Sequence, residues 1–543
     1  MSSTRGGRGA SSLRRVVVPH VLAWPGRLSG PAWGAVATAA CFVVVTGWWL
    51  SVDRSVPYND AAQHLFFAFR VHDLVDQGQF MQVVDFPSFY PPATYLLGAA
   101  AAFLGGIHVA VPILAQNVVY VPLLALACYR IGRMTPSPPS PTAGLLAVVF
   151  ALGAPLVIEQ FHVFMLDIPQ AALVAVAAWL ILASERFARV GVAALAGLAL
   201  GLGIASKELA PLYLVGLVAC VLARDGGWRN WRGVLALVAV ALLVGAPWYV
   251  RQLTIGQGAG IVHAAGAGGE VPPAASPSPI SLANLAWYFW ATLDGLLFAP
   301  LFAFASVGVG AAIARVVRAR PANDFTLELL CGLGGAWLAL TAMPHHDMRY
   351  TIGLIAFLAV LGTAWIVRLA PAPRAVAISL LAAAIVAAHV GATLGVGGEA
   401  SRQLPGSRRA AYGEGVPPRG RVIVYSNQNF LISGPHGHPD VLALLESLRR
   451  EGVTTIGFVD HVESFDRNFE ETGLWVLARV ASLQVVAQPE AIATPGPGQA
   501  LAIRAPPTGG VAPCLRLADG SGVWLRVGAA DGGPPHDGCG VSG

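Results

Sequence analysis

Residues Pro57 to Pro92 read PYNDAAQHLFFAFRVHDLVDQGQFMQVVDFPSFYPP and follow the first long apolar run of the chain. Between Asn59 and Asp76, apolar residues recur on one side, a pattern that predicts an amphipathic helix lying along a membrane surface. Asp60 and His64 are one helical turn apart and face the same way. The stretch holds further ionisable residues, namely Arg70, His72, Asp73, Asp76 and Asp85. So many ionisable groups beside an apolar run predict a functional site here.

The composition excludes an ordinary soluble protein. Of the 543 residues, 55% are hydrophobic and only 12% are charged, whereas soluble domains carry about a quarter charged residues. We therefore expect an all-α polytopic membrane protein. The formal net charge of +5 reflects arginines in the loops on one side of the membrane, so it does not indicate nucleic-acid binding.

About eleven spans are expected, and the arginines set their orientation. The spans lie near residues 33–50, 107–129, 142–158, 168–184, 191–206, 209–223, 233–250, 285–314, 325–342, 350–367 and 375–395. Alternate loops carry arginine, which places them in the cytoplasm together with the disordered N-terminus, residues 1–30. The first loop (51–106), a flexible loop (252–284) and the C-terminus then lie outside. We expect an integral protein of the cytoplasmic membrane whose transmembrane domain covers residues 31–397, with no cleaved signal peptide.

The composition changes after Gly398, and residues 398–543 are expected to form a small extracytoplasmic α/β domain. Strand patterns cover residues 421–426, 454–459 and 500–504, and helix patterns cover 439–450 and 465–481. Four of the six cysteines fall in predicted spans, where they serve packing. Cys514 and Cys539 flank a predicted hairpin in the external tail, where an oxidising exterior allows them to form a disulfide.

Two outer carboxylates are candidate catalytic groups, and each has a simpler alternative. Asp60 opens the amphipathic segment, so it is either a helix cap or a general base or cation-binding carboxylate. Asp167 stands directly before Ile168-Pro169 at the start of a span, where a cap is again the alternative. The residue types alone leave both interpretations open.

Outer cations supply candidate phosphate-binding groups. Lys207 is the only lysine in the chain, and it either extends its amine toward the membrane surface or binds a phosphate. Arg349, at a later outer junction, is a second phosphate candidate. His345, His346 and Asp347 beside it could bind a metal, although their spacing is not specific. A divalent cation therefore stays open, and no other cofactor is expected.

Six segments of the chain resemble lipid-linked-sugar glycosyltransferases of the GT-C class, in the branch that contains protein O-mannosyltransferases and the aminoarabinose transferase of lipid A. The resemblance covers roughly residues 33–370. The segments are Asn59-Asp-Ala-Ala-Gln-His64, Tyr90-Pro-Pro-Ala-Thr-Tyr95, Met165-Leu-Asp-Ile-Pro169, Ser206-Lys207, Pro247-Trp-Tyr-Val-Arg251 and His345-His-Asp-Met-Arg-Tyr350. Each motif is weak alone, and their order and common membrane side make the set specific.

The resemblance implies inverting transfer of a sugar from a polyprenyl-phosphate carrier to an extracytoplasmic acceptor, whether a protein, a lipid or a cell-wall glycan. It implies catalytic roles for Asp60 and Asp167. The residues that it implies in substrate binding are His64, Tyr90, Lys207, Arg251, His346, Arg349 and Tyr350. At two positions the chain departs from the motifs that are common in this branch, which weakens the roles implied for those positions. The branch's common Asp-Glu pair is Asp60-Ala61 here, and His346 stands where a lysine is frequent.

A transporter or flippase for a lipid-linked or anionic substrate is the competing class. It would place ionisable residues near the bilayer midplane on broken helices, often in repeated halves. Here they gather at one face without an internal repeat, which favours the enzyme. A scaffold whose outer domain binds a partner is a third interpretation, and it would leave Asp60 and Lys207 without a role.

Overall fold

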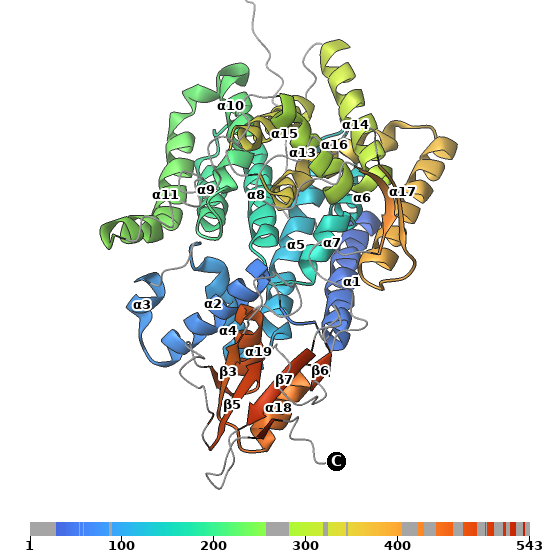
Figure 1. The fold of residues 1–543 in the computed structure, drawn as a ribbon. Coiled ribbons are helices and arrows are strands. Elements are labelled where there is room, and N and C mark those ends of the chain that lie inside the picture. The colour runs from blue at the N-terminus through green and yellow to red at the C-terminus, as the bar shows by residue number, and fades with distance from the viewer. Residues whose placement is uncertain are drawn as a thin grey trace, which may run out of the picture.

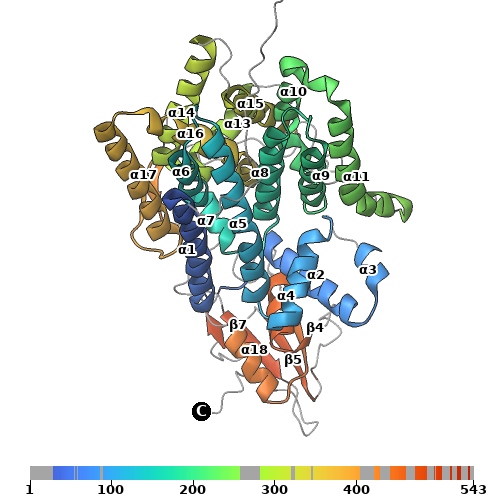
Figure 2. The same ribbon diagram turned by 180° about the vertical axis from the view of Figure 1, so that it is seen from behind.

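The computed structural model is helical over most of its length (Figures 1 and 2). It describes the chain except for residues 1–28, 54, 58, 86–89, 257–281, 319–323, 344–345, 404–420, 428–440, 460–470, 486–494, 496, 504–513, 517–521, 528–535 and 538–543. The α-helices are α1 (Gly30–Val52), α2 (Asn59–Asp76), α3 (Phe80–Asp85), α4 (Ala93–Gly105), α5 (Ala110–Met134), α6 (Pro141–Leu152), α7 (Pro155–Phe161), α8 (Asp167–Ala183), α9 (Val190–Ile204), α10 (Val215–Ala223), α11 (Trp231–Thr254), α13 (Leu282–Trp290), α14 (Phe298–Arg318), α15 (Thr326–Ala342), α16 (Ile355–Ala364), α17 (Pro371–Ala392), α18 (Val441–Arg450) and α19 (Glu471–Val480). Shorter helical turns are η1 (Ala210–Tyr213), η2 (Arg224–Arg229), the π-helix η3 (Ala291–Leu296), η4 (Met348–Leu354) and η5 (Ile366–Arg368).

The chain is an integral membrane protein. Within the described residues, six helical segments are long and apolar enough to cross a membrane, and a bent pair of helices would make a seventh. The six are α1, α5, α11, α14, the continuous segment from η4 through η5, and α17. Shorter apolar helices accompany them, namely α4, α8, α9 and α15. The count of eleven spans and the orientation stay predictions.

Two of the predicted spans are interrupted in the structure. The span expected at 142–158 is α6 and α7, which bend by 67°. Pro155 opens α7, as suits a residue with no N–H to donate, and a Cβ at Gly153 would lie 2.6 Å from Ile385. The span expected at 285–314 is divided into α13, η3 and α14. A Cβ at Gly295 in η3 would overlap the Met348 side chain. Apolar composition alone does not register such glycine-dependent contacts.

The predicted amphipathic helix is present as α2, with the predicted bounds. Its apolar side is covered by protein, because Leu65, Phe69 and Leu74 are all buried and the helix packs against α4 and α19. A Cβ at Gly98 of α4 would lie 2.9 Å from Ala68 Cβ, so glycine allows the two helices to approach this closely. Burying a leucine or phenylalanine contributes roughly 1.5–3 kcal/mol relative to water. These contacts fix α2 and the polar residues of its first turn.

The strands lie in two groups near the C-terminal end of the chain. They are β1 (Glu399–Gln403), β2 (Arg421–Ser426), β3 (Thr455–Val459), β4 (Gln484–Val485), β5 (Gln499–Ile503), β6 (Leu515–Arg516), β7 (Gly522–Val527) and β8 (His536–Asp537). The larger sheet runs β4-β3-β5-β7-β6, and β8 pairs with β7. Strand β3 is parallel to β4 and β5, whereas β5 is antiparallel to β7. The sheet lies with α18 and α19 at the same end of the molecule as α2 and α4 (Figure 1).

The predicted elements of residues 398–543 are largely present, but they do not form a single sheet. Strand β2 has the predicted bounds, yet it pairs with β1 and packs against α14 and α17. Gly391 of α17 permits this contact, because a Cβ there would overlap the Ser426 carbonyl. The α19 helix instead contacts α2, where Val476 joins the buried cluster that contains Leu65. The division into a separate α/β domain stays a prediction.

Candidate functional site

The Arg349 guanidinium lies between two carboxylates at the start of η4. Its Nη1 is 2.7 Å from Asp60 Oδ2 on α2. Its Nε donates to Asp347 Oδ2 at 2.9 Å, and its backbone N–H donates to Asp347 Oδ1 at 2.8 Å. Asp347 thus caps η4 and orients the guanidinium, while Asp60 reaches it from a segment almost 300 residues away in the chain. Because α2 begins at Asn59 and the Asp60 carboxylate faces Arg349, the helix-cap interpretation of Asp60 loses its basis.

Both carboxylates beside Arg349 are ionised at neutral pH. Burial alone would raise the pKa of Asp60, but the charge of Arg349, the charge of His64 and the hydrogen bond from Arg349 together outweigh it and leave the pKa below its usual value. The same balance lowers the pKa of Asp347 to about 2, with burial opposed by Arg349. Asp60 is therefore an anion whose basicity is held down chiefly by one specific cation. Any ligand that attracts the guanidinium away would raise the basicity of Asp60.

A second ion pair lies deeper. Lys207 Nζ donates to Asp167 Oδ1 at 2.8 Å, and the two side chains are only 4% and 1% exposed. Lys207 is thus buried in the protein, which removes the interpretation of a lysine that reaches toward the membrane surface. Asp167 is the first residue of α8, and Leu166 occupies the N-cap position before it, so Asp167 is not at the position of the predicted cap. Within the described residues its Oδ2 has no hydrogen-bond partner.

Aromatic rings join the two ion pairs. Lys207 Nζ lies 5.0 Å from the ring centroid of Tyr350 and 5.8 Å from that of Tyr90, within the range of cation–π attraction. The backbone N–H of Ala93, next to the Tyr90 segment, donates to the Ala205 carbonyl at 3.1 Å, which ties that segment to the lysine turn. Burial raises the pKa of Tyr90 well above its usual value, so its hydroxyl stays protonated.

His64 completes the site as a neutral group. It is buried, and its Nδ1 lies 2.9 Å from the Tyr95 hydroxyl. Burial lowers the pKa of His64 to about 3, and the positive charges of Lys207 and Arg349 contribute in the same direction. Since Asp60, Lys207 and Arg349 all act on this one ring, the two ion pairs belong to one site.

The structure brings together seven of the predicted site residues, namely Asp60, His64, Tyr90, Asp167, Lys207, Arg349 and Tyr350. Arg251 instead forms a two-bond ion pair with Asp85 of α3, at 2.6 and 2.9 Å. His346 is buried between Trp287 and Tyr288, with ring centroids 5.3 Å apart in each case. Arg251 and His346 were predicted to bind substrate. In the structure they contact other side chains of the protein, so substrate binding by these two residues stays a prediction.

Sequence reasoning missed three neighbours of the site. Asp347 was noted only as a metal candidate, although its role is to hold Arg349. Tyr95 and Glu208 were not proposed as site residues; burial raises the pKa of Glu208 above its usual value. Both residues could have been found from their closeness in sequence to predicted site residues. Glu208 directly follows Lys207, and Tyr95 ends the segment that begins at Tyr90.

The metal and disulfide predictions concern residues that the structure describes only in part. Among the described residues, no group of three or more His, Cys, Asp or Glu side chains could hold a metal ion, and His345 lies outside the described residues. A divalent cation therefore stays an untested prediction. Cys514 is disulfide-bonded, and its predicted partner Cys539 lies outside the described residues, so the pairing stays a prediction.

Comparison with known proteins identifies the fold. No family model and no curated protein matches the chain. ArnT from Cupriavidus metallidurans bound to undecaprenyl phosphate, a lipid A aminoarabinose transferase, matches with a TM-score of 0.55 and 16% identity over 88% of this chain and 93% of ArnT. AglB, an archaeal oligosaccharyltransferase from Archaeoglobus fulgidus in complex with an inhibitory peptide and a dolichol-phosphate, matches with a TM-score of 0.43 and 12% identity over 85% of this chain and 65% of AglB. The ArnT match shows that the chain has the fold of a GT-C glycosyltransferase, which confirms the predicted resemblance.

Proposed function

We propose that this protein is a membrane glycosyltransferase that transfers a sugar from a polyprenyl-phosphate carrier to an extracytoplasmic acceptor. The observation that carries the proposal is the pairing of the Asp60 carboxylate with Arg349, 2.7 Å apart, beside the buried Lys207–Asp167 pair. A carboxylate and two cations in one site match the needs of a sugar-phosphate donor and a hydroxyl acceptor. The fold shared with ArnT, which was solved with undecaprenyl phosphate, supports the same donor class.

In the proposed reaction, Asp60 is the general base. It takes the proton of the acceptor hydroxyl as the oxygen attacks the anomeric carbon of the sugar. The bond between that carbon and the phosphate oxygen breaks, and the carrier leaves as polyprenyl phosphate. Attack from the face opposite the leaving group inverts the anomeric centre.

Arg349 and Lys207 are the proposed partners of the leaving phosphate. Preformed cations in a water-poor site stabilise charge that develops on the leaving group. In the free protein both are held by carboxylates, so the phosphate must compete with Asp60 and Asp167 for them. When Arg349 turns toward the phosphate, Asp60 loses its main cation and becomes a stronger base. Donor binding would thus prepare the base for the acceptor.

The remaining site residues position these groups. Tyr90 and Tyr350 present ring faces to Lys207, and the Tyr95 hydroxyl fixes the His64 ring beside Asp60. With a pKa of about 3, His64 is a weak base, so the proposed base is one of the two predicted catalytic carboxylates, Asp60 or Asp167. Asp60 is the proposed base because its carboxylate is one-third exposed, whereas that of Asp167 is 1% exposed.

Mass spectrometry of cell-envelope glycans, glycolipids and glycoproteins tests the proposal. Cells that carry the wild-type protein should contain a glycosylated product that is missing from cells without the gene. The Asp60→Asn variant should also lack it, while Asp76→Asn, a matched change at an exposed position of the same helix, should retain it. A transporter or flippase would instead relocate a lipid-linked substrate without forming a new glycosidic bond, so identical glycans in all four strains contradict the proposal.

A further inference from the structure

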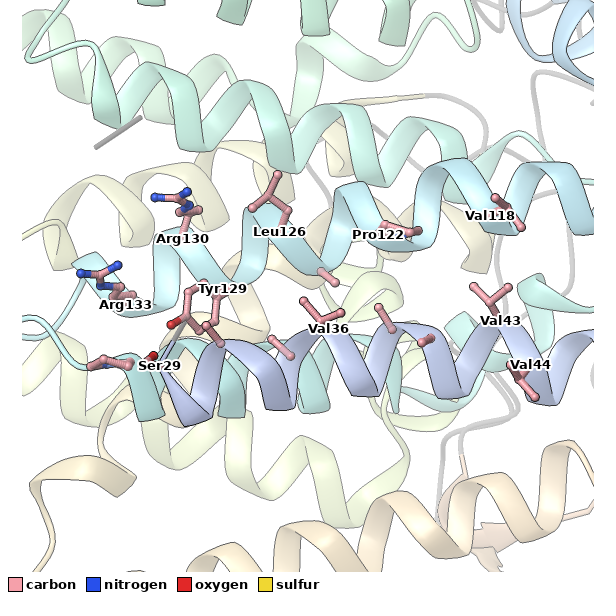
Figure 3. A pocket seen from close by; sticks show the side chains of 16 residues that line it. Ser29, Val36, Val43, Val44, Val118, Pro122, Leu126, Tyr129, Arg130 and Arg133 are labelled. Carbon is pink, nitrogen blue, oxygen red and sulfur yellow. The ribbon is translucent and has the colours of Figure 1, made fainter. Parts of the chain in front are cut away.

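A groove between α1 and α5 forms a second candidate binding site. Its volume is about 600 Å³, and its wall is almost entirely apolar (Figure 3). Small side chains of α1 form one side of it, and the other side belongs to α5. Its apolar lining includes Ala32, Ala35, Ala39, Val118, Pro122 and Leu126. The groove belongs to two membrane-spanning helices and lies apart from the residues of the glycosyltransferase site.

One end of the groove is strongly basic. Arg130 and Arg133 of α5 line it there, together with Tyr129 and Ser29, as Figure 3 shows. The Arg130 guanidinium is held over the Trp179 ring, 5.5 Å from its centroid, and the like charges of Arg130 and Arg133 repel each other. Within the described part of the chain, Arg133 has no ion pair. This end lies at the start of α1, and the outer segment with α2 follows the other end of that helix.

We propose that this groove binds an acidic glycerophospholipid from the leaflet at the arginine end of the bundle. The lipid phosphate would contact Arg130 and Arg133, and one acyl chain would lie along the alanine-rich face of α1. From Ser29 to Val44 the groove follows 15 residues of α1, about 22 Å at 1.5 Å per residue. That length exceeds the ~15 Å depth of one leaflet of a 30 Å hydrocarbon core. A full acyl chain therefore fits alongside α1.

Charge decides against the other occupants. Residues 1–28, which precede α1, contain five arginines and neither Asp nor Glu, so this segment has no acidic group with which to neutralise Arg130 and Arg133. A second copy in a two-fold dimer would place the same patch of each subunit against the other and bring arginines to arginines. An anionic head group relieves this repulsion, and basic pockets between membrane helices bind acidic lipid head groups for that reason.

Native mass spectrometry of the purified full-length protein tests the proposal. The protein is titrated with phosphatidylglycerol or with phosphatidylcholine of the same acyl chains. We expect the wild type to retain phosphatidylglycerol preferentially. Arg133→Gln should reduce that preference about fivefold, which corresponds to ~1 kcal/mol for one arginine near a membrane surface. Arg318→Gln is the matched control, because Arg318 also ends a span, on α14, and does not line the groove.

A second variant tests the groove separately from its charge. Val36 lines the groove and is 44% exposed, so Val36→Trp fills the groove without disturbing the core. This variant should retain less of both lipids, whether or not Arg133→Gln folds. Equal retention of the two lipids by the wild type would overturn the proposal. So would equal losses in Arg133→Gln and Arg318→Gln, unchanged retention in Val36→Trp, or a dimer whose groove takes up no lipid.

Discussion

Replacing Lys207 by Met should destabilise the protein strongly, because Asp167 would stay buried without its cation. The pair is 2.8 Å apart, and the side chains are only 4% and 1% exposed. Breaking a buried pair by removing one partner costs about 3–5 kcal/mol in the free energy of unfolding. Methionine keeps the apolar stem of the lysine, so the change removes chiefly the charge. The loss is measured by denaturant titration in mixed micelles.

The double variant Lys207→Met/Asp167→Asn separates stability from function. Without the uncompensated carboxylate, it should recover most of the lost free energy of unfolding, since neighbouring substitutions are not additive. It still lacks the cation, so its affinity for polyprenyl phosphate should stay about 10- to 100-fold below that of the wild type, in line with ~1.5–3 kcal/mol for a hydrogen bond to a charged group. Lys207→Arg should recover part of the affinity.

Two results would refute this reasoning. A destabilisation of less than about 1 kcal/mol in Lys207→Met is the size expected for an exposed ion pair. Such a result would contradict the claim that the Lys207–Asp167 pair is buried away from water. Wild-type affinity for polyprenyl phosphate in the folded double variant would remove Lys207 from donor binding and leave it a structural residue.

Three further predictions concern other parts of the molecule. The pKa of Asp347 falls from its ordinary value of 3.8 to about 2. The contribution of this carboxylate to stability is therefore complete above pH 3.8 and is lost as the pH falls toward 2. The melting midpoint should drop between these pH values, and the drop should be smaller in Asp347→Asn. A Cβ at Gly473 of α19 would overlap the Pro57 carbonyl, so Gly473→Ala should loosen α19 from α2 and speed proteolysis between residues 398 and 470, whereas Gly398→Ala, which meets nothing within 4 Å, should not. Cys514 and Cys539 should resist thiol labelling until a reductant is added, and two free thiols in protein taken directly from the envelope would rule the disulfide out.

The sequence predicted what periodicity and composition control. The bounds of α2 and β2 follow from local patterns, and the order of the motifs predicted the GT-C fold. The motifs that contain Asp60, Lys207 and Arg349 predicted all three as site residues, and the structure brings them together. What the sequence could not specify was partner choice, since Asp60 pairs with Arg349 across almost 300 residues.

The features that the sequence did not predict involve residues distant in the chain. Gly153 and Gly295, at the two interruptions, lie close to Ile385 and Met348, whereas hydropathy averages over neighbours in the sequence. The placement of β2 against α14 and α17 depends on Gly391 in the same way. The resemblance implied substrate binding for both Arg251 and Lys207, yet the Asp85–Arg251 pair is partly exposed and the Lys207 pair is buried. Burial is set by the tertiary structure.

The transfer rate of purified Asp60→Asn protein tests the central claim most directly. Asparagine retains an oxygen that accepts a hydrogen bond from Arg349, but it takes no proton at neutral pH, so the ion pair is weakened and the base is lost. With the donor and acceptor identified from the envelope glycans, single-turnover transfer should slow by about 10²–10⁴-fold, with a melting midpoint close to that of the wild type. A folded Asp60→Asn protein that keeps most of the wild-type rate would contradict the account and make Asp167 the leading carboxylate.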